Sequence, residues 1–106
     1  MATFPLPKIT LDERVVIMTG GDRGLGLSMA KALAKCGAKL VIAAIDKKFC
    51  DNAVRELENY VGQECGFSVK TDITDLTQCR DLVKEALDRF GRLDVLFNNA
   101  RRLMRG

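Results

Sequence analysis

Short apolar runs alternate with longer amphipathic stretches along this chain, and each change of pattern predicts a change of secondary structure. Four of the runs are typical of strands buried on both faces of a parallel sheet, namely residues 14–19, 39–45, 67–71 and 93–97. Between them, apolar residues recur every three or four positions, which predicts helices over residues 25–36, 50–64 and 76–90. Strands and helices therefore alternate, as they do in α/β proteins.

The ends of the predicted helices carry specific signals. Gly37 and Gly91 follow the first and third helices, where glycine readily takes the left-handed conformation that closes a helix. Asp75 precedes the third helix and Gln78 stands three residues later, which is the spacing of a capping box. The first helix is expected to turn one apolar face to the sheet, formed by Leu25, Met29, Ala32, Leu33 and Cys36.

The alternating order predicts an α/β fold with parallel strands joined by right-handed crossovers. It matches half of a doubly wound Rossmann sheet, with four strands in the order 3-2-1-4 and helices on both faces. Pro5 and Pro7 disfavour regular structure near the N-terminus, so residues 1–13 are expected to form an irregular lead-in. Residues 14–106 are expected to form one domain.

Composition excludes several classes of function. The 106 residues are 47% hydrophobic and 29% charged, and the net charge of +3 is too small and dispersed to indicate a nucleic acid or a membrane surface as partner. No apolar run approaches the roughly 20 residues that span a bilayer, and no secretory signal is visible, so we expect a cytoplasmic protein. The four cysteines form no C-x-x-C pair and the chain has no histidine, so neither a metal site nor a disulfide is expected.

The most informative segment is the glycine-rich turn after the first predicted strand, which reads TGGDRGLG over residues 19–26. A strand, a glycine turn and a helix start together direct backbone N–H groups and a helix dipole toward a phosphate. Gly20 lets the chain leave the strand, Gly24 permits a turn that disfavours a Cβ, and Gly26 allows a pyrophosphate to approach the helix. The segment is therefore either a nucleotide-binding turn or a purely structural one.

Two related phosphate-binding motifs do not fit this turn. The strict G-x-G-x-x-G fingerprint, counted from Gly24, would need glycine where Met29 stands. A P-loop counted from Gly21 would need lysine in place of Leu27, and without that ammonium an NTPase loses its main contact to the β- and γ-phosphates. The spacing that fits is T-G-x-x-x-G-x-G.

Two further polar signals follow predicted strands, at the edge of a parallel sheet where ligands bind. Asp72 and Ile73 come after the third strand, where a carboxylate can accept a hydrogen bond from an adenine amino group. Asn98, Asn99 and Ala100 come after the fourth strand, where side-chain amides can tie neighbouring loops together and reach a ribose. Each signal alone is also ordinary turn chemistry.

Together, TGGDRGLG, DITD at 72–75 and NNA at 98–100 resemble the N-terminal half of a short-chain dehydrogenase/reductase, over residues 10–100. The resemblance implies a partial NAD(P)-binding Rossmann domain in residues 14–106. The implied cofactor-binding residues are Gly20, Arg23, Gly24, Leu25 and Gly26 in the glycine turn, Asp72 and Ile73 at the adenine, and Asn98 and Ala100 at the ribose side. Arg101 departs from the family pattern NNAG, which places glycine there.

The choice between the two nicotinamide cofactors is less direct. Asp46 lies 20 residues beyond the last glycine of the turn, near the usual offset of an acid that binds a ribose 2′-hydroxyl, and is a candidate cofactor-binding residue. In the family register, however, that acid position falls on Ala44. Arg23, with Lys47 and Lys48, can instead pair with a 2′-phosphate, so we favour NADP(H) over NAD(H).

The chain lacks the catalytic groups that the family places in its second half, a serine and a Y-x-x-x-K pair. Its single tyrosine, Tyr60, is followed four residues later by Glu64, and its serines are Ser28 and Ser68. No catalytic residue is therefore assigned, and we expect a truncated oxidoreductase of the family that does not transfer hydride alone. The alternative is a non-catalytic dinucleotide-binding or decoy module that pairs with a full-length relative through the fourth strand, whose exposed edge also favours self-association.

Overall fold

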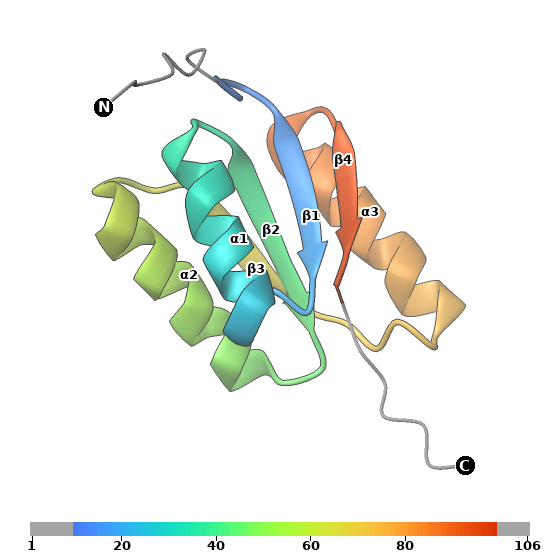
Figure 1. Ribbon diagram of the computed structural model, residues 1–106. Helices are drawn as coiled ribbons and strands as arrows, with labels where there is room; N and C mark the ends of the chain where they lie inside the picture. The colour runs from blue at the N-terminus through green and yellow to red at the C-terminus, as the bar shows by residue number, and fades with distance from the viewer. Residues whose placement is uncertain (1–9, 100–106) are drawn as a thin grey trace, which may run out of the picture.

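The computed structural model describes residues 10–99 of the chain. Its strands are β1 (Val15–Thr19), β2 (Lys39–Ala44), β3 (Gly66–Lys70) and β4 (Val95–Asn98), and its helices are α1 (Gly24–Lys35), α2 (Lys47–Val61) and α3 (Leu76–Phe90). The strands form one parallel sheet in the order β3-β2-β1-β4 (Figure 1). The predicted α/β fold and strand order are confirmed. Of the predicted lead-in, only residues 10–13 are described, and they form neither helix nor strand.

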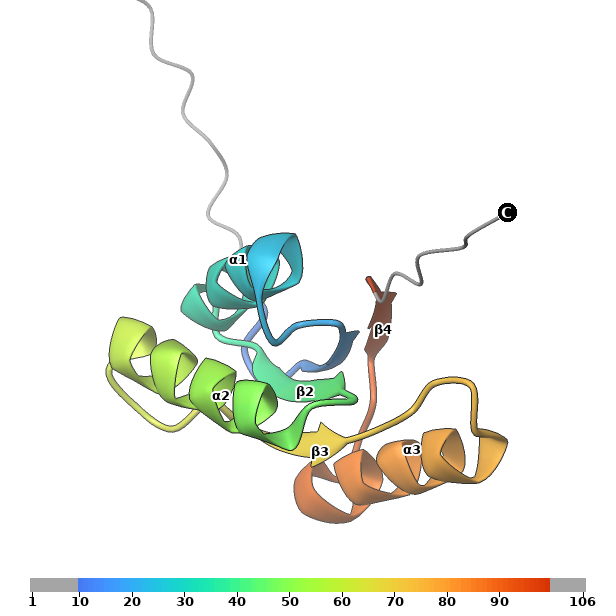
Figure 2. The ribbon, with the colours of Figure 1, turned by 90° about the horizontal axis from the view of Figure 1, so that it is seen from below.

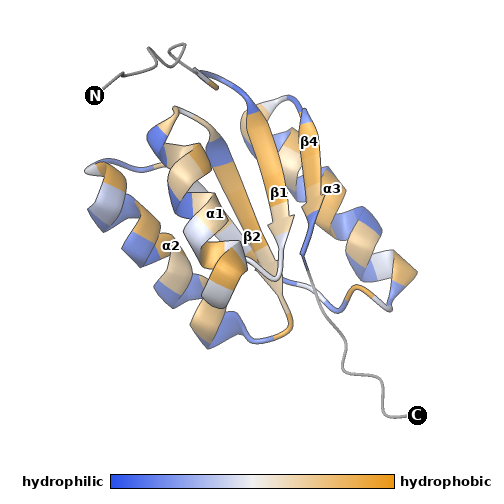
Figure 3. Cartoon of the chain, viewed as in Figure 1, coloured by the Kyte–Doolittle hydropathy of each residue, from blue (hydrophilic) through white to orange (hydrophobic). Residues whose placement is uncertain are grey.

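Helices cover both faces of the sheet, as predicted. Helices α1 and α2 pack on one face and α3 on the other, as the view from below in Figure 2 shows. All five residues of β1 are buried, because this strand is paired on both edges and covered on both faces. The hydropathy colouring in Figure 3 shows the resulting apolar centre in β1 and β2. This centre holds the carboxyl ends of the strands in fixed positions.

The face that α1 turns to the sheet differs from the prediction. Its buried residues are the small ones, Gly26, Ala30 and Ala34, spaced four apart. Leu25, predicted to point inward, is 69% exposed, and Leu33 is only partly buried at the border of the core. Small side chains let the helix backbone lie close to the strands, so residue size rather than hydrophobicity sets the rotation of this helix.

Side-chain caps decide where the other two helices begin. Helix α2 begins three residues before the predicted start, because the Asp46 carboxylate accepts a hydrogen bond from the Phe49 N–H at 3.1 Å and caps the helix. Helix α3 has the predicted bounds, and Asp75 caps it by accepting from the N–H groups of Thr77 and Gln78. The predicted cap of α3 is therefore confirmed.

Apolar surface remains exposed on α3 and on β4. Helix α3 buries Leu82 and Ala86, but three other apolar residues of this helix are exposed: Leu76, Val83 and Leu87. Strand β4 stands at the edge of the sheet, and Leu96 is 60% exposed there. No other element within residues 10–99 covers these side chains.

Candidate functional site

A cavity of about 710 Å³ lies at the carboxyl ends of the strands. Its walls come from the turn after β1, the end of β2, and the segments that follow β3 and β4. Five of the predicted site residues line it: Gly20, Arg23, Leu25, Asp72 and Ile73. Residues about 50 positions apart in the sequence thus meet at the edge where open parallel sheets bind ligands.

The remaining predicted site residues have other positions. Gly24 and Gly26 lie in the first turn of α1, Asn98 ends β4, and Asp46 caps α2; none of these four lines the cavity. Ala100 and the neighbouring Arg101 lie outside the described residues.

Two glycines of this segment differ in the space around them. Gly24 is open on the side where a Cβ would stand, and Gly26 is closely packed there. Gly24 has a φ of 59°, and a Cβ built on it would meet nothing within 4 Å. At Gly26, a Cβ would collide with the carbonyl oxygen of Gly20 and would lie 2.6 Å from Nδ2 of Asn99. Gly26 is therefore needed for close packing of the turn against the end of β4.

The start of α1 is suited to an anion. Arg23 is the N-cap residue, yet it makes no side-chain cap hydrogen bond, and the first turn contains no acidic residue. Helices α2 and α3, by contrast, are each capped by an aspartate. The N–H groups and the positive dipole end of α1 therefore meet no side-chain carboxylate in the helix's own cap or first turn.

Asn98 at the end of β4 and Asn99 after it join the cavity to the sheet. The Thr19 hydroxyl lies 3.0 Å from Oδ1 of Asn98, to which it donates, and the Asn99 N–H lies 3.2 Å from both oxygens of Thr19. Asn99, which was not among the predicted binding residues, lines the cavity itself. The signal for it was present in the NNA motif, because neighbouring residues of an extended chain point to opposite sides.

The segment after β3 is held by its own hydrogen bonds. The Asp72 carboxylate accepts from the N–H and the hydroxyl of Thr74, at 2.9 and 2.6 Å. The Asp72 N–H donates to Oε1 of Gln78 at 2.8 Å, while Nε2 of Gln78 donates to the Asp75 carboxylate. Gln78 thus braces the turn before α3 instead of completing a reciprocal capping box at the Asp75 N–H.

The thiol of Cys50, beneath the first turn of α2, is not a nucleophile. Burial, with the charge of Asp22 as the next cause, raises the pKa of Cys50 to about 11. The thiol is therefore protonated at neutral pH and packs as a small apolar group. Within residues 10–99, no three histidine, cysteine or acidic side chains gather where they could hold a metal ion. In that range no helix has the length and apolar character needed to cross a membrane.

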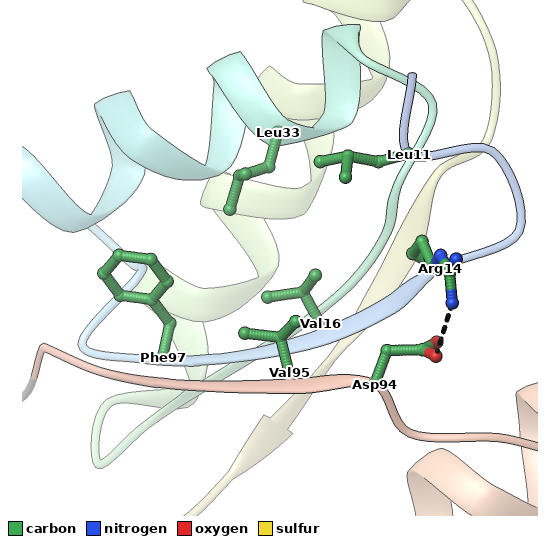
Figure 4. A pocket seen from close by; sticks show the side chains of 7 residues that line it. All are labelled: Leu11, Arg14, Val16, Leu33, Asp94, Val95 and Phe97. Carbon is green, nitrogen blue, oxygen red and sulfur yellow. Dashed lines mark hydrogen bonds and ion pairs between the residues drawn. The ribbon is translucent and has the colours of Figure 1, made fainter. Parts of the chain in front are cut away.

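A second cavity, of about 330 Å³, lies between α1 and β4. Its apolar wall includes Leu33, Val95 and Phe97, and the Arg14–Asp94 ion pair at 3.4 Å stands at one end (Figure 4). None of the predicted site residues lines it, so the larger cavity is the candidate site.

Comparison with known proteins decides the family. The family model for short chain dehydrogenases matches residues 14–104. The chain belongs to the short-chain dehydrogenase family. An oxidoreductase of Methylorubrum extorquens, itself uncharacterized, is 40% identical over 90 residues, which are 85% of this chain and 36% of that protein.

Two solved structures of short-chain dehydrogenase relatives carry a cofactor. The L-sorbose reductase of Gluconobacter frateurii, complexed with NADPH and L-sorbose, is 28% identical with a TM-score of 0.84 over 91% of this chain and 36% of that one. The 3-ketoacyl-(acyl-carrier-protein) reductase of Brucella melitensis, complexed with NADH, is 33% identical with a TM-score of 0.74 over 82% of this chain and 34% of that one. The chain thus spans about a third of the length of these relatives.

The geometry of the site fits the dinucleotide that short-chain dehydrogenases bind. The open side of Gly24 and the uncapped start of α1 suit a diphosphate. The cavity between the glycine turn and Asp72 has the size of an ordinary small-molecule site.

Proposed function

We propose that this chain supplies the adenosine half of the cofactor site of an NAD(P)-dependent oxidoreductase that acts on an alcohol or a carbonyl compound. The observation that carries the proposal is the cavity of about 710 Å³ beside the α1 start, which lacks a side-chain cap. When bound, the nicotinamide cofactor donates or accepts the hydride. The chain's own residues bind and orient its adenosine end.

The proposed contacts follow the positions of the residues. The diphosphate is assigned to the backbone of Gly20 and of the first α1 residues Gly24, Leu25 and Gly26, because this segment includes the positive end of α1. The adenine is assigned to the pocket wall at Asp72 and Ile73. The adenine ribose is assigned to Asn98 and Ala100 on the family resemblance, since Asn98 ends β4 beside Asn99, which lines the cavity, and Ala100 lies outside the described residues.

The proposed cofactor is NADP(H). Arg23 lines the cavity and its side chain is 70% exposed, so its guanidinium is accessible to a phosphate. Ala44, at the end of β2, puts a methyl group in the wall where an acid would otherwise bind ribose hydroxyls. The Asp46 carboxylate already accepts the Phe49 N–H, which favours a capping role over a contact to ribose.

Hydride transfer is proposed to need groups that this chain does not carry. The family's serine and Y-x-x-x-K pair are absent from its sequence, and the second half of the site must come from elsewhere. The unpaired edge of β4 favours one alternative function, a dinucleotide-binding or decoy module that pairs there with a full-length relative. A cytoplasmic location is proposed because all four cysteines are free, as expected in a reducing compartment.

Titration with NADPH and NADH, followed by amide NMR, tests the binding proposal. We expect shifts at the Gly24 and Gly26 amides with both nucleotides and a lower Kd for NADPH. The amide of Gly62, at the far end of α2, is the internal control and should not move. Absence of shifts at Gly24 and Gly26 in well-folded protein contradicts the proposal.

Mixing experiments separate the two functions. The chain is added to a full-length relative that is inactivated within its own cofactor turn. Recovered turnover supports complementation of an enzyme, because the added half-site then serves the partner's catalytic half. Nucleotide binding without turnover supports the non-catalytic module.

A further inference from the structure

Phe49, in the first turn of α2, lies under the guanidinium of Arg23. The Arg23 Cζ is 4.7 Å from the centroid of the ring. A cation at this distance from an aromatic face is attracted by the ring's quadrupole. The contact joins two elements, because Arg23 belongs to the glycine turn after β1 and Phe49 to the helix after β2.

The same guanidinium is held on a second side by Asp22. Nε of Arg23 lies 3.7 Å from Oδ2 of Asp22, whose side chain is only 8% exposed and so is a fixed anchor. With Nε toward Asp22 and one face on Phe49, the two terminal nitrogens remain for a ligand. A guanidinium ordered in advance loses less conformational entropy when it binds an oxyanion in bidentate fashion.

The nearby Lys47 is engaged elsewhere. Its Nζ donates to Oδ1 of Asp51 at 2.8 Å and to Oγ of Ser68 at 3.2 Å, so it ties α2 to β3. These two hydrogen bonds hold the ammonium between α2 and β3, outside the lining of the cavity, which makes Lys47 a poor site for a further anion. Of these two cations, Arg23 is the one that lines the cavity.

We propose that Phe49 is a positioning residue that holds Arg23 ready for the 2′-phosphate of an adenosine nucleotide and thereby sets the cofactor preference. The inference rests on the proposed nucleotide-binding function. It adds the residue contact that distinguishes nucleotides with a 2′-phosphate from those without one. Phe49 itself does not line the cavity and acts only through Arg23.

Two nucleotides that differ by one phosphate test the inference on the whole chain. Adenosine 2′,5′-bisphosphate and adenosine 5′-monophosphate are titrated by calorimetry into wild type, Phe49→Leu and Phe49→Tyr. Phe49→Leu keeps apolar bulk but removes the ring, and should weaken the bisphosphate about two- to fivefold, with the monophosphate unchanged. Phe49→Tyr, which keeps the ring, should restore wild-type binding.

Two further variants calibrate the effect. Arg23→Ala should weaken the bisphosphate at least about tenfold. Tyr60→Leu removes another ring of α2, which lies under Lys35 at 5.3 Å, and should change neither affinity. If Phe49→Leu weakens both nucleotides equally, or neither, the positioning role is wrong while the binding function stands. If neither nucleotide binds the wild type, the proposed function fails and the inference with it.

Discussion

Gly26 shows how one residue can serve the sheet and the cofactor turn together. It lies in the first turn of α1, is buried, and faces the carbonyl of Gly20 and the side chain of Asn99. Because both neighbours also belong to the walls of the cavity, any shift at Gly26 moves the site.

The variant Gly26→Ala tests this coupling. Alanine is normally preferred to glycine within a helix, but here its Cβ would strike a backbone oxygen, so we expect a loss of about 1–3 kcal/mol in the free energy of unfolding. Nucleotide affinity should fall as well. Urea denaturation and calorimetric titration measure the two effects.

Gly62→Ala is the matched control. Gly62 has a φ of 87° and open space around it, so alanine should cost about 1–2 kcal/mol through backbone strain alone. Its nucleotide affinity should match the wild type. A Gly26→Ala variant that is more stable and binds normally would show that the turn has room to relax.

Asp94 is a second residue with effects on distant elements. Its carboxylate accepts from the Val15 N–H at 2.8 Å and from Arg92 at 2.6 Å, which fixes the start of β4 against β1. The hydrogen bond from Arg92 is the main reason that the pKa of Asp94 is lowered from 3.8 to about 2, and the Val15 N–H is the next.

This lowered pKa predicts a pH dependence of stability. The folded state binds the proton less readily than the unfolded state, so the contribution of Asp94 is complete above pH 3.8 and is lost as the pH falls through about 2. The stability difference between wild type and Asp94→Asn should therefore shrink across that window. Urea midpoints at several pH values measure it. Asp88→Asn, in an exposed ion pair with Lys84, should show a much weaker trend.

At the level of elements, the apolar pattern predicted α3 and the four strands because run length and spacing distinguish strands from helices, even where burial is incomplete, as on α3 and β4. It misplaced the inward face of α1, where Gly26, Ala30 and Ala34 pack closest and the larger side chains lie to the sides. It also placed the start of α2 at Cys50, where the apolar spacing begins, although the helix begins at Lys47 after the cap residue Asp46. An aspartate that caps a helix and an aspartate that binds a ligand occupy the same kind of position after a strand. Only the hydrogen bonds of the folded chain, here from the Phe49 N–H, distinguish the two roles.

Two substitutions at Asp46 test its role in α2. Asp46→Ala removes the acceptor of the Phe49 N–H and should lower the free energy of unfolding by about 1 kcal/mol. Asp46→Asn retains an acceptor and should stay close to wild type. Thermal and urea denaturation monitored by circular dichroism provide the comparison. Equal losses in both variants would point to the charge rather than the cap.

For the molecule as a whole, the sequence predicted the location of the candidate site. It predicted less of the contacts that each residue makes there. Residues of the glycine turn, Asp72 and Asn99 lie together at one edge of the sheet, because parallel strands bring their carboxyl ends together. The lining by Asn99 and the contact between Arg23 and Phe49 depend on side-chain directions across elements. No local pattern encodes those directions.

The open edge of β4 predicts concentration-dependent association. Leu96 is 60% exposed on β4, an apolar strand that pairs with β1 on one edge and with no other strand of residues 10–99 on the other. Such open edges pair with other strands. Sedimentation velocity over a range of concentrations should show species larger than a monomer, and Leu96→Lys should reduce them. Leu76→Lys changes a side chain of similar exposure, 66%, on a helix and should have little effect. A monomer at all concentrations would contradict this prediction.

The placement of β4 beside β1 also affects how the chain is made. The Val15 N–H meets the Asp94 carboxylate across 79 residues of sequence, so β1 cannot pair with β4 until those 79 residues have been synthesised. At roughly 5–20 residues per second, that delay is about 4–16 s. During this interval one edge of β1 is unpaired in the nascent chain. Chaperones that bind this edge should increase the yield of native protein.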